Sequence, residues 1–323
     1  MEENGLIYAY LLDGNGGARQ LDREEISQWD SNQGVLWLHL NLLNRSAAEW
    51  ISEKAQVEPI VSEALLSEET RPRTIIIDDG ILIALRGVNL NPGADPEDMV
   101  AIRAWIDRNR IISTQKRTLL SVKDIADTLL DKKGPKTPGE FIVELSDRLI
   151  SRMEDTVEDI EDRVAQLEEK ILVTESYELR SEISAIRRES IMLRRYLAPQ
   201  REAMVRLYSE KVSWLSDSDR MCAREATDRL IRHIEDLDSV RDRAAVTQEE
   251  LVNKLSEQMN IRMYVLSLVA AIFLPLGFLT GLLGINVGGI PGAENKLAFY
   301  IFIFSLIIVV TLQLLLFKRK RWI

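Results

Sequence analysis

Few residues in this chain have side chains and spacing that suit a reaction or a tight ligand. There is one cysteine, Cys222, and there are two histidines, His39 and His233, far apart in the sequence. One thiol and two imidazoles cannot form a disulfide framework, and they are too few for a tetrahedral structural zinc site within one chain. The sequence also lacks a Gly-x-x-x-x-Gly-Lys phosphate loop and any nucleophile–base spacing. We therefore expect neither an enzyme nor a bound cofactor.

One short polar turn, Gly284-Ile285-Asn286, is the remaining candidate. Read without its surroundings, Asn286 could simply be a left-handed turn residue or a helix cap. The elements on either side of it are more informative. They are two apolar runs, residues 264–283 and 297–317, of twenty and twenty-one residues with no charged side chain in either.

These two runs predict transmembrane helices. A helix rises 1.5 Å per residue, so each run covers the roughly 30 Å of a bilayer's hydrocarbon core. In lipid only a helix satisfies all its own backbone groups in a single pass. The segment between the runs, residues 284–296, contains four glycines and one proline and predicts a tight extracytoplasmic loop.

The basic residues predict the orientation. Four of them follow the second run directly, Lys318, Arg319, Lys320 and Arg321, and they form the tail 318–323. Lys254 and Arg262 precede the first run. Because basic residues stay on the cytoplasmic side, we expect both termini in the cytoplasm of a multi-pass protein of the bacterial inner (plasma) membrane. No signal-peptide pattern opens the sequence, which agrees with a cytosolic N-terminal part.

The charge is unevenly distributed. Of 51 acidic and 41 basic residues, one acidic and five basic ones lie in residues 264–323, which leaves 50 and 36, a net charge of −14, in residues 1–263. An acidic body repels nucleic acid, so we expect no nucleic-acid partner, and it attracts cations. The plainer interpretation is that the acidic residues only form solvated faces.

The sequence before the membrane predicts a cytosolic α/β domain over residues 1–170. Short β-forming runs at 74–77 and 81–85, separated by Asp-Asp-Gly, indicate a hairpin, and residues 99–106 and 111–114 indicate another. Apolar residues at helical spacing predict helices over 139–172 and about 176–212, with a break or kink at Pro199. A helix capped by Ser216 or Asp217 can run unbroken to 283, so residues 171–263 form a helical stalk or funnel. A coiled coil or an ordinary bundle would show the same periodicity.

These features together resemble the CorA family of divalent cation transporters. Its loop signature is usually Gly-Met-Asn, and Gly284-Ile285-Asn286 looks like the zinc-transporting ZntB branch. The resemblance extends over nearly the whole chain and includes, from first to last, Leu12-Asp13-Gly14, Trp37-Leu38-His39-Leu40-Asn41, Thr70-Arg71-Pro72-Arg73, Arg194-Arg195-Tyr196, Ala198-Pro199-Gln200-Arg201, Phe273-Leu274-Pro275 and Phe278-Leu279-Thr280-Gly281.

The resemblance implies a funnel-shaped homopentamer with a central pore. Gly284, Ile285 and Asn286 would form the outer mouth and bind a still-hydrated metal ion through carbonyl and carboxamide oxygens. It further implies uptake of Zn²⁺ coupled to protons, with tolerance of Ni²⁺, Cd²⁺ or Co²⁺. The four basic residues at 318–321 would form a cytosolic ring that acts as a gate or as a membrane-lipid anchor.

Six residues correspond to the family's pore lining, and their steps of three or four residues keep them on one helical face. They are Met263, Leu266, Ala270, Leu274, Gly277 and Gly281. This face has no carboxylate, so we expect hydrated ions and closure by dewetting. Gly277-x-x-x-Gly281 could instead, or also, pack helices. Family members often have Thr where Gly277 stands, so a polar ring is missing here unless Thr280 substitutes for it.

Two other functions stay open at this point. A CorA-like channel for Mg²⁺ or Co²⁺, driven by membrane potential alone, would need no proton path, and neither apolar run contains a carboxylate or histidine for one. A structural or signalling module with a hairpin membrane anchor would have the same two spans. The sequence therefore predicts an α+β membrane protein with an α/β cytosolic domain, a helical stalk and two C-terminal transmembrane helices.

Overall fold

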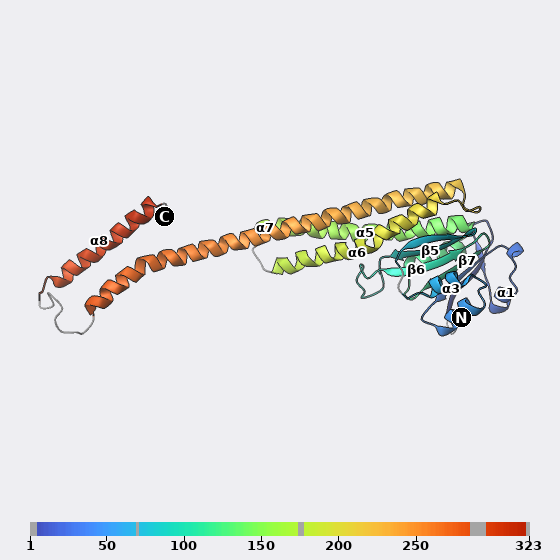
Figure 1. The fold of residues 1–323 in the computed structure, drawn as a ribbon, viewed down its shortest axis with the longest axis horizontal. Helices are drawn as coiled ribbons and strands as arrows, with labels where there is room; N and C mark the ends of the chain where they lie inside the picture. Colours follow the sequence, from blue (N-terminus) through green and yellow to red (C-terminus); the bar gives the residue numbers. More distant parts are fainter. Residues whose placement is uncertain (1–4, 69–70, 174–177, 285–294, 321–323) are drawn as a thin grey trace. The chain divides into compact units, whose positions relative to one another are not determined.

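The computed structural model describes residues 5–68, 71–173, 178–284 and 295–320. The chain divides into two compact units, Met1–Glu249 and Glu250–Ile323. The first contains a β-sheet, helices α1–α6 and the first part of α7, and the second contains the rest of α7 and α8 (Figure 1). The domain boundaries that the sequence suggests at residues 170 and 263 fall inside the helices α5 and α7 and stay predictions.

The strands are β1 (Leu6–Leu12), β2 (Ala18–Gln20), β3 (Val35–Asn41), β4 (Arg73–Ile77), β5 (Gly80–Gly87), β6 (Val100–Ile106) and β7 (Arg110–Gln115). The short helices are α1 (Arg23–Ser27), the 3₁₀ turn η2 (Ser31–Gln33), α2 (Arg45–Glu53), α3 (Pro59–Leu66) and α4 (Leu120–Leu130). The long helices are α5 (Pro138–Val173), α6 (Glu178–Ser209), α7 (Asp217–Gly284) and α8 (Ala298–Arg319).

The strands form one seven-stranded sheet in the order β2-β1-β3-β7-β6-β5-β4. β3 and β7 run parallel, and the other neighbours in this sheet are antiparallel. Both predicted hairpins are confirmed, β4–β5 and β6–β7. The first turns at Asp78 and Asp79, where Asp78 has a left-handed φ of 51°.

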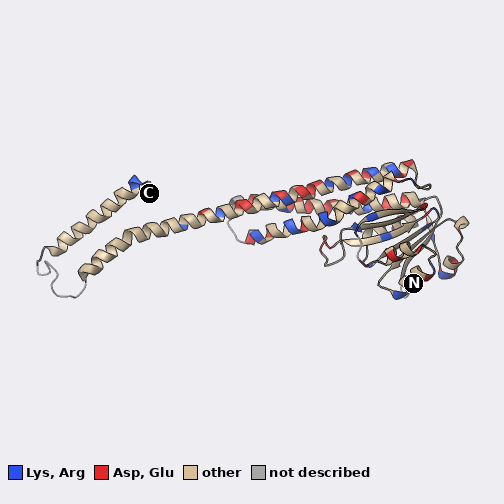
Figure 2. Cartoon of the chain, in the orientation of Figure 1, with Lys and Arg blue, Asp and Glu red and all other residues tan. Residues whose placement is uncertain are grey.

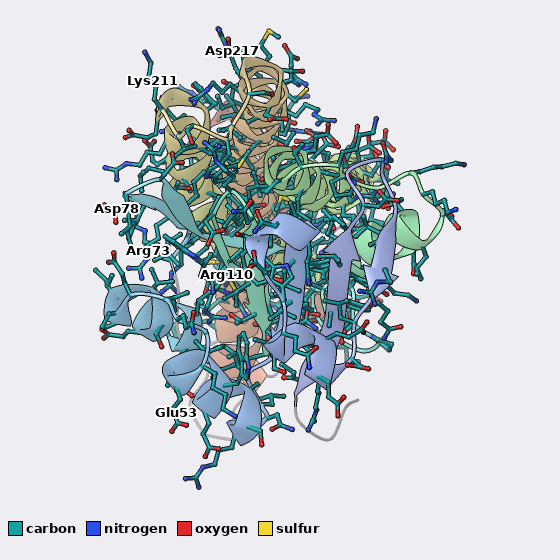
Figure 3. The ribbon with its side chains drawn as sticks, turned by 90° about the vertical axis from the view of Figure 1, so that its right-hand side faces the viewer. Glu53, Arg73, Asp78, Arg110, Lys211 and Asp217 are labelled. Atoms are coloured by element: carbon teal, nitrogen blue, oxygen red, sulfur yellow. The ribbon has the colours of Figure 1, made fainter. Side chains whose placement is uncertain are left out.

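Successive side chains along a strand point to opposite faces of the sheet. Because the central strands are buried at consecutive positions, both faces of the sheet are covered. On one face, α2 and α3 contribute Ala47, Ile51, Val61 and Leu65 to a core shared with Leu40 and Ile112 of the sheet. On the other face, Trp37 of β3 meets Phe141 of α5 with ring centroids 4.9 Å apart. Viewed from its end, the sheet lies between the helical layer with Lys211 and Asp217 and the helix with Glu53 (Figure 3).

The predicted long helices are confirmed, with one correction at Pro199. The sequence predicts a break or kink there: a break is wrong, because α6 continues through this residue to Ser209, and a kink stays a prediction. The neighbouring Gln200 is buried and anchors the helix to the sheet: its amide accepts from the Arg86 N–H at 2.7 Å and donates to the Arg86 carbonyl at 3.1 Å. Arg86 lies beyond Ala84, where the pairing of β5 with β4 ends, so Gln200 takes the place of a partner strand.

The start of α7 is fixed by a reciprocal cap. The Ser216 hydroxyl accepts from the Asp219 N–H at 3.1 Å, and the Asp219 carboxylate accepts from the Ser216 N–H at 3.0 Å. Such a pair satisfies two donors that a helix N-terminus leaves open. From there α7 runs as one helix to Gly284, as the sequence predicts.

Charged residues crowd α5, α6 and the first part of α7, whereas α7 beyond Arg262 and α8 before Lys318 carry none (Figure 2). Several of these charges pair between helices of the first unit. Arg243 of α7 holds Glu168 of α5 at 2.6 Å, and Arg163 of α5 holds Glu189 of α6 at 2.9 Å. The Arg243 guanidinium lowers the pKa of Glu168, chiefly through their hydrogen bond.

We predict that Gln200→Leu destabilises the first unit while Arg201→Ala does not. Leucine cannot make the two hydrogen bonds that the Gln200 amide makes with the N–H and carbonyl of Arg86. Losing the partner of a buried polar group costs about 1–3 kcal/mol of folding free energy. Arg201 is a matched control, because its side chain is exposed and its described hydrogen bonds go to the carboxylate of the neighbouring Glu202. Thermal unfolding followed by tryptophan fluorescence checks this, and equal melting temperatures for the two variants would contradict it.

Candidate functional site

The second unit contains two helical stretches that are apolar on all sides, α7 beyond Arg262 and α8 before Lys318. The last part of α7 and α8 are long and apolar enough to cross a membrane, and no stretch of their most apolar windows is buried in the single chain. A helix that is apolar all round needs an apolar surrounding, which here is lipid or further copies of the chain. This agrees with the two predicted spans.

The six predicted pore residues lie on α7, and each is exposed in the single chain. Met263, Leu266 and Leu274 expose 63%, 70% and 74% of their surface. A Cβ added at Gly277, Gly281 or Gly284 would meet no atom within 4 Å. The Gly277-x-x-x-Gly281 stripe therefore has no packing partner among the described residues of its own chain. The pore-lining role of this face stays a prediction.

The predicted outer mouth is only partly within the described residues. Gly284 is the last residue of α7. Ile285 and Asn286 lie outside the described residues, so the metal site at Gly284, Ile285 and Asn286 stays a prediction. Thr280, one turn earlier, donates its hydroxyl to the carbonyls of Leu276 at 3.0 Å and Gly277 at 3.1 Å. Its oxygen keeps acceptor capacity, and its part in a polar ring stays a prediction.

A contact that the sequence analysis missed joins the two spans. Pro275 of α7 has no N–H, so the carbonyl of Ala271, four residues earlier, loses its partner within the helix. Gln313 of α8 supplies one: its side-chain amide donates to the Ala271 carbonyl at 3.3 Å. In lipid such a carbonyl must find a donor, and neighbouring helices commonly provide it. The signal was present in the sequence as one proline in the first run and one carboxamide in the second.

The basic tail begins inside α8. Lys318 and Arg319 lie in the last turn of the helix, and Lys320 caps it, its N–H donating to the Leu316 carbonyl at 3.0 Å. Positive charge there stabilises the negative end of the helix dipole. Arg321 lies outside the described residues, and the ring proposed for Lys318, Arg319, Lys320 and Arg321 stays a prediction.

The histidine and cysteine side chains of the first unit, which could bind a soft metal ion, are not gathered in one place. His39 lies in the sheet, whereas Cys222 and His233 lie on α7, where Cys222 is exposed. Burial lowers the pKa of His233 against the opposing effect of Asp236, and burial raises the pKa of Glu161. No group of three or more His, Cys, Asp or Glu side chains in the described part of the chain is arranged to hold a metal ion.

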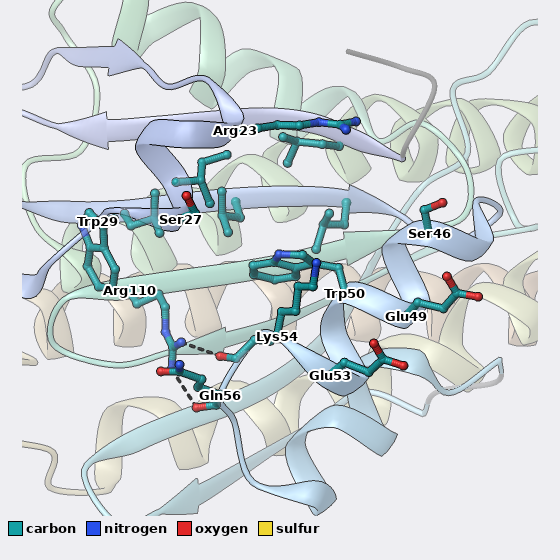
Figure 4. A pocket seen from close by; sticks show the side chains of 16 residues that line it. Arg23, Ser27, Trp29, Ser46, Glu49, Trp50, Glu53, Lys54, Gln56 and Arg110 are labelled. Carbon is teal, nitrogen blue, oxygen red and sulfur yellow. Dashed lines mark hydrogen bonds between the residues drawn. The ribbon is translucent and has the colours of Figure 1, made fainter.

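The largest cavity described in the first unit, about 620 Å³, lies over strands β1 and β3 between α1 and α2 (Figure 4). Its floor is leucine, and Trp29 and Trp50 flank it. Arg110 is already engaged, since its guanidinium donates to the carbonyls of Ala55 at 2.6 Å and Gln56 at 3.5 Å. The described lining contains no Asp, His or Cys side chain.

An α/β cytosolic unit, a helix that continues into an apolar span and a second apolar span define a two-span membrane protein. A family model described as "CorA-like Mg2+ transporter protein" matches residues 32–319. The "Divalent cation transporter CmaX" of Pseudomonas aeruginosa is 39% identical over 325 aligned positions, covering 100% of this chain and 98% of that protein. The "Zinc transport protein ZntB" of Pectobacterium carotovorum is 36% identical over 323, with the same coverage.

Solved structures agree with these relatives. The full-length CmaX structure, at 39% identity, gives a TM-score of 0.88 and covers 100% of this chain and 99% of that one. The CorA magnesium transporter of Methanocaldococcus jannaschii gives 0.81 over 98% and 99% of the two chains, and at 17% identity it shows the same fold.

The chain belongs to the CorA-like family of divalent cation transporters. The fold class predicted from the sequence, an α/β cytosolic domain, a long helix and two C-terminal spans, is confirmed. The prediction of an inner-membrane transporter, not an enzyme, with its N-terminal domain in the cytoplasm, is also confirmed. The alternative of a non-transporting membrane anchor is thereby excluded.

We predict that the Gln313 contact stabilises the pair of spans only because Pro275 is present. Gln313→Leu should destabilise the solubilised protein, and in a Pro275→Ala background it should do so less, since the restored N–H can bond the Ala271 carbonyl. Hydrogen bonds between membrane helices measured in this way average about 0.6 kcal/mol and reach about 1.7.

A double-mutant cycle by thermal unfolding gives this coupling energy. Thr311→Val is the control, because Thr311 donates to Ile307 of its own helix at 2.7 Å. If Gln313→Leu lowers stability by the same amount in the wild type and in the Pro275→Ala background, the proposed link between Gln313 and Pro275 is wrong.

Proposed function

We propose that this transporter takes up Zn²⁺ into the cytoplasm through the central pore of a homopentamer, with protons as the coupling ion. Full-length similarity to a protein named as a zinc transport protein carries the zinc assignment. Ni²⁺, Cd²⁺ and Co²⁺ are the further ions that the same pore would accept. Proton coupling rests on the resemblance to the ZntB branch.

The shape of α7 supports a pore built from several copies. Its face from Met263 to Gly281 has large apolar side chains at one end and glycines at the other, and the described residues of the same chain do not cover it. If several copies turn this face inward, the glycines widen the path, and Met263, Leu266 and Leu274 narrow it at apolar rings. Such rings close a pore by excluding water.

The chemistry of the spans supports passage of a hydrated ion. In their described residues, 264–284 and 297–317, no carboxylate, thiol or imidazole is present to replace water around a metal. The membrane potential favours entry, because a divalent ion gains roughly 4.6 kcal/mol per 100 mV, about a thousandfold accumulation. Selectivity then has to come from oxygen ligands at the outer mouth, for which Asn286 is the candidate.

A channel for Mg²⁺ or Co²⁺ driven by potential alone is the second candidate. The family model's description names Mg²⁺, and the described residues of the spans include no carboxylate, thiol or imidazole to pass a proton. The two candidates differ in one measurable property, the response of flux to a proton gradient at fixed voltage.

We predict that purified protein in proteoliposomes takes up Zn²⁺ faster with an inward proton gradient and that Asn286→Ala lowers this flux at least tenfold. Asn295→Ala, in the same loop, is the matched control and should keep the flux. A zinc-sensitive dye inside the vesicles reports the rate. Zn²⁺ or Mg²⁺ flux that follows voltage and ignores pH would favour the potential-driven channel.

We predict that Leu274→Ser raises the resting flux of divalent ions several-fold, because a hydroxyl ring lets water enter an apolar constriction. Leu276→Ser is the control, since residue 276 is about 200° away around the helix. The same dye assay compares the two variants. Unchanged or reduced flux through Leu274→Ser, with Leu276→Ser equal to the wild type, would refute an apolar gate at this position.

A further inference from the structure

The ends of the two parallel strands, β3 and β7, form a second, polar cavity in the first unit. Asn41 and Gln115 are paired at the carboxyl ends of these strands. From there β3 leads to α2, which packs on one face of the sheet with Leu40 and Ile112. β7 leads instead to α4, which packs against α5 on the opposite face. Where neighbouring parallel strands diverge in this way, the chain leaves a crevice that α/β proteins use for ligands.

This crevice is a cavity of about 290 Å³. Its polar lining consists of one imidazole, three carboxamides and two ammonium groups: His39, Asn41, Asn44, Gln115, Lys116 and Lys123. The remaining described lining is apolar or hydroxyl-bearing, and none of it is Asp or Glu. In a chain with 51 acidic residues, a cavity bordered by two lysines and no carboxylate is suited to an anion.

His39 points to a ligand most directly. It is fully buried, and its Nε2 has no hydrogen-bond partner of normal geometry among the described residues. Its Nδ1 lies 2.8 Å from the Ser113 hydroxyl, which accepts from the Trp37 indole N–H at 2.9 Å. The hydroxyl proton can go to Nδ1 or to the Leu38 carbonyl, and the carbonyl is farther away at 3.3 Å.

This geometry assigns the proton of the neutral ring to Nε2. A hydroxyl that donates to Nδ1 makes that nitrogen an acceptor, so Nε2 carries the remaining hydrogen as a donor. Burial lowers the pKa of His39 to about 4, and a hydrogen bond with the Gln115 side chain only partly opposes this, so the ring is neutral in the cytoplasm. That contact falls short of normal hydrogen-bond geometry, and the Gln115 oxygen already accepts from the Leu119 N–H at 3.2 Å, so Gln115 satisfies Nε2 poorly. A buried donor without an acceptor is costly, and a bound anion would satisfy it.

Positive charge comes from α4 and from two lysines. The N-cap of α4 is Leu119, which cannot cap with its side chain, and Lys123 lies exposed in the first turns. The N-terminus of such a helix attracts phosphate groups. The Lys116 ammonium lies 2.9 Å from the carboxylate of Glu68, which is 88% exposed. Exposed pairs of this kind are weak, so Lys116 can turn to a stronger partner.

We propose that this cavity, defined by His39, Gln115 and Lys123 at the ends of β3 and β7, binds a small phosphate-bearing molecule. The phosphate lies against the N-terminus of α4 and Lys123, and it accepts from His39 Nε2. The carboxamides of Asn41 and Asn44 border the rest of the space. This site is in the cytoplasmic unit and is independent of which ion the transporter carries.

The test is calorimetric titration of the full-length protein in detergent with inorganic phosphate and with glycerol phosphate, at constant ionic strength against chloride. We expect saturable binding of one molecule per chain. Lys123→Ala should weaken it at least tenfold, and Lys133→Ala, an exposed lysine just beyond the other end of α4, should leave it unchanged. Tighter binding of glycerol phosphate identifies an organic phosphate, and equal binding identifies the free anion.

His39→Gln tests the buried donor independently of charge, with the melting temperature of each variant as the check on folding. We expect a folded protein that binds phosphate at least threefold more weakly. Absence of saturable binding, or equal affinity in wild type and Lys123→Ala, overturns the proposal. Equal weakening by Lys123→Ala and Lys133→Ala also overturns it, because that result shows a general effect of charge and not a site.

Discussion

Every backbone carbonyl that enters lipid must find a donor within the protein, and the membrane unit of this transporter depends on that constraint. It explains why the chain crosses as helices and why α7 continues to Gly284 without an irregular segment. It also explains the one polar contact described between the spans. Pro275 frees the carbonyl of Ala271, and the only carboxamide of the second apolar run, Gln313, lies where it can donate to it.

The same helix serves two different surroundings, and its sequence changes accordingly. In the first unit α7 has one buried stripe, with Leu230, Leu237 and Ala244 fully buried and charged residues between them. An amphipathic stripe is what a helix needs when it packs on neighbours and faces water. After Arg262 the charges stop and the apolar residues extend all round, as suits a helix surrounded by lipid or by neighbouring helices.

Local periodicity predicted most of these elements, since hairpin turns, helix caps and apolar runs are short-range signals. It predicted the turn at Asp78 and a cap at Ser216 or Asp217, and the structure forms the turn and the cap at Ser216. It was wrong about a break at Pro199, because a neighbouring residue outweighs local propensity: Gln200 binds the sheet on the same turn of α6.

Polar contacts between residues far apart in the sequence could not be predicted in the same way. Gln313 and Ala271 are 42 residues apart, and His39 and Ser113 are 74 apart, so their meeting depends on how the elements pack. A single sequence shows that such residues are unusual for their surroundings but does not show their partners. The resemblance to a family supplied the pore face, which periodicity alone could place on one side of a helix but could not assign to a pore.

The acidic character of the cytosolic unit fits transport better than storage of metal. Several of its carboxylates are held by arginines: Glu168 by Arg243, Glu189 by Arg163, and Asp147 by Arg229. A paired carboxylate still contributes to the long-range field but is a poor ligand, because binding a metal would first require breaking its ion pair. An ion that leaves the membrane is thus attracted by net charge without meeting, in the described residues, a cluster that could trap it. Conduction requires that balance, since an ion must enter favourably and still be able to leave.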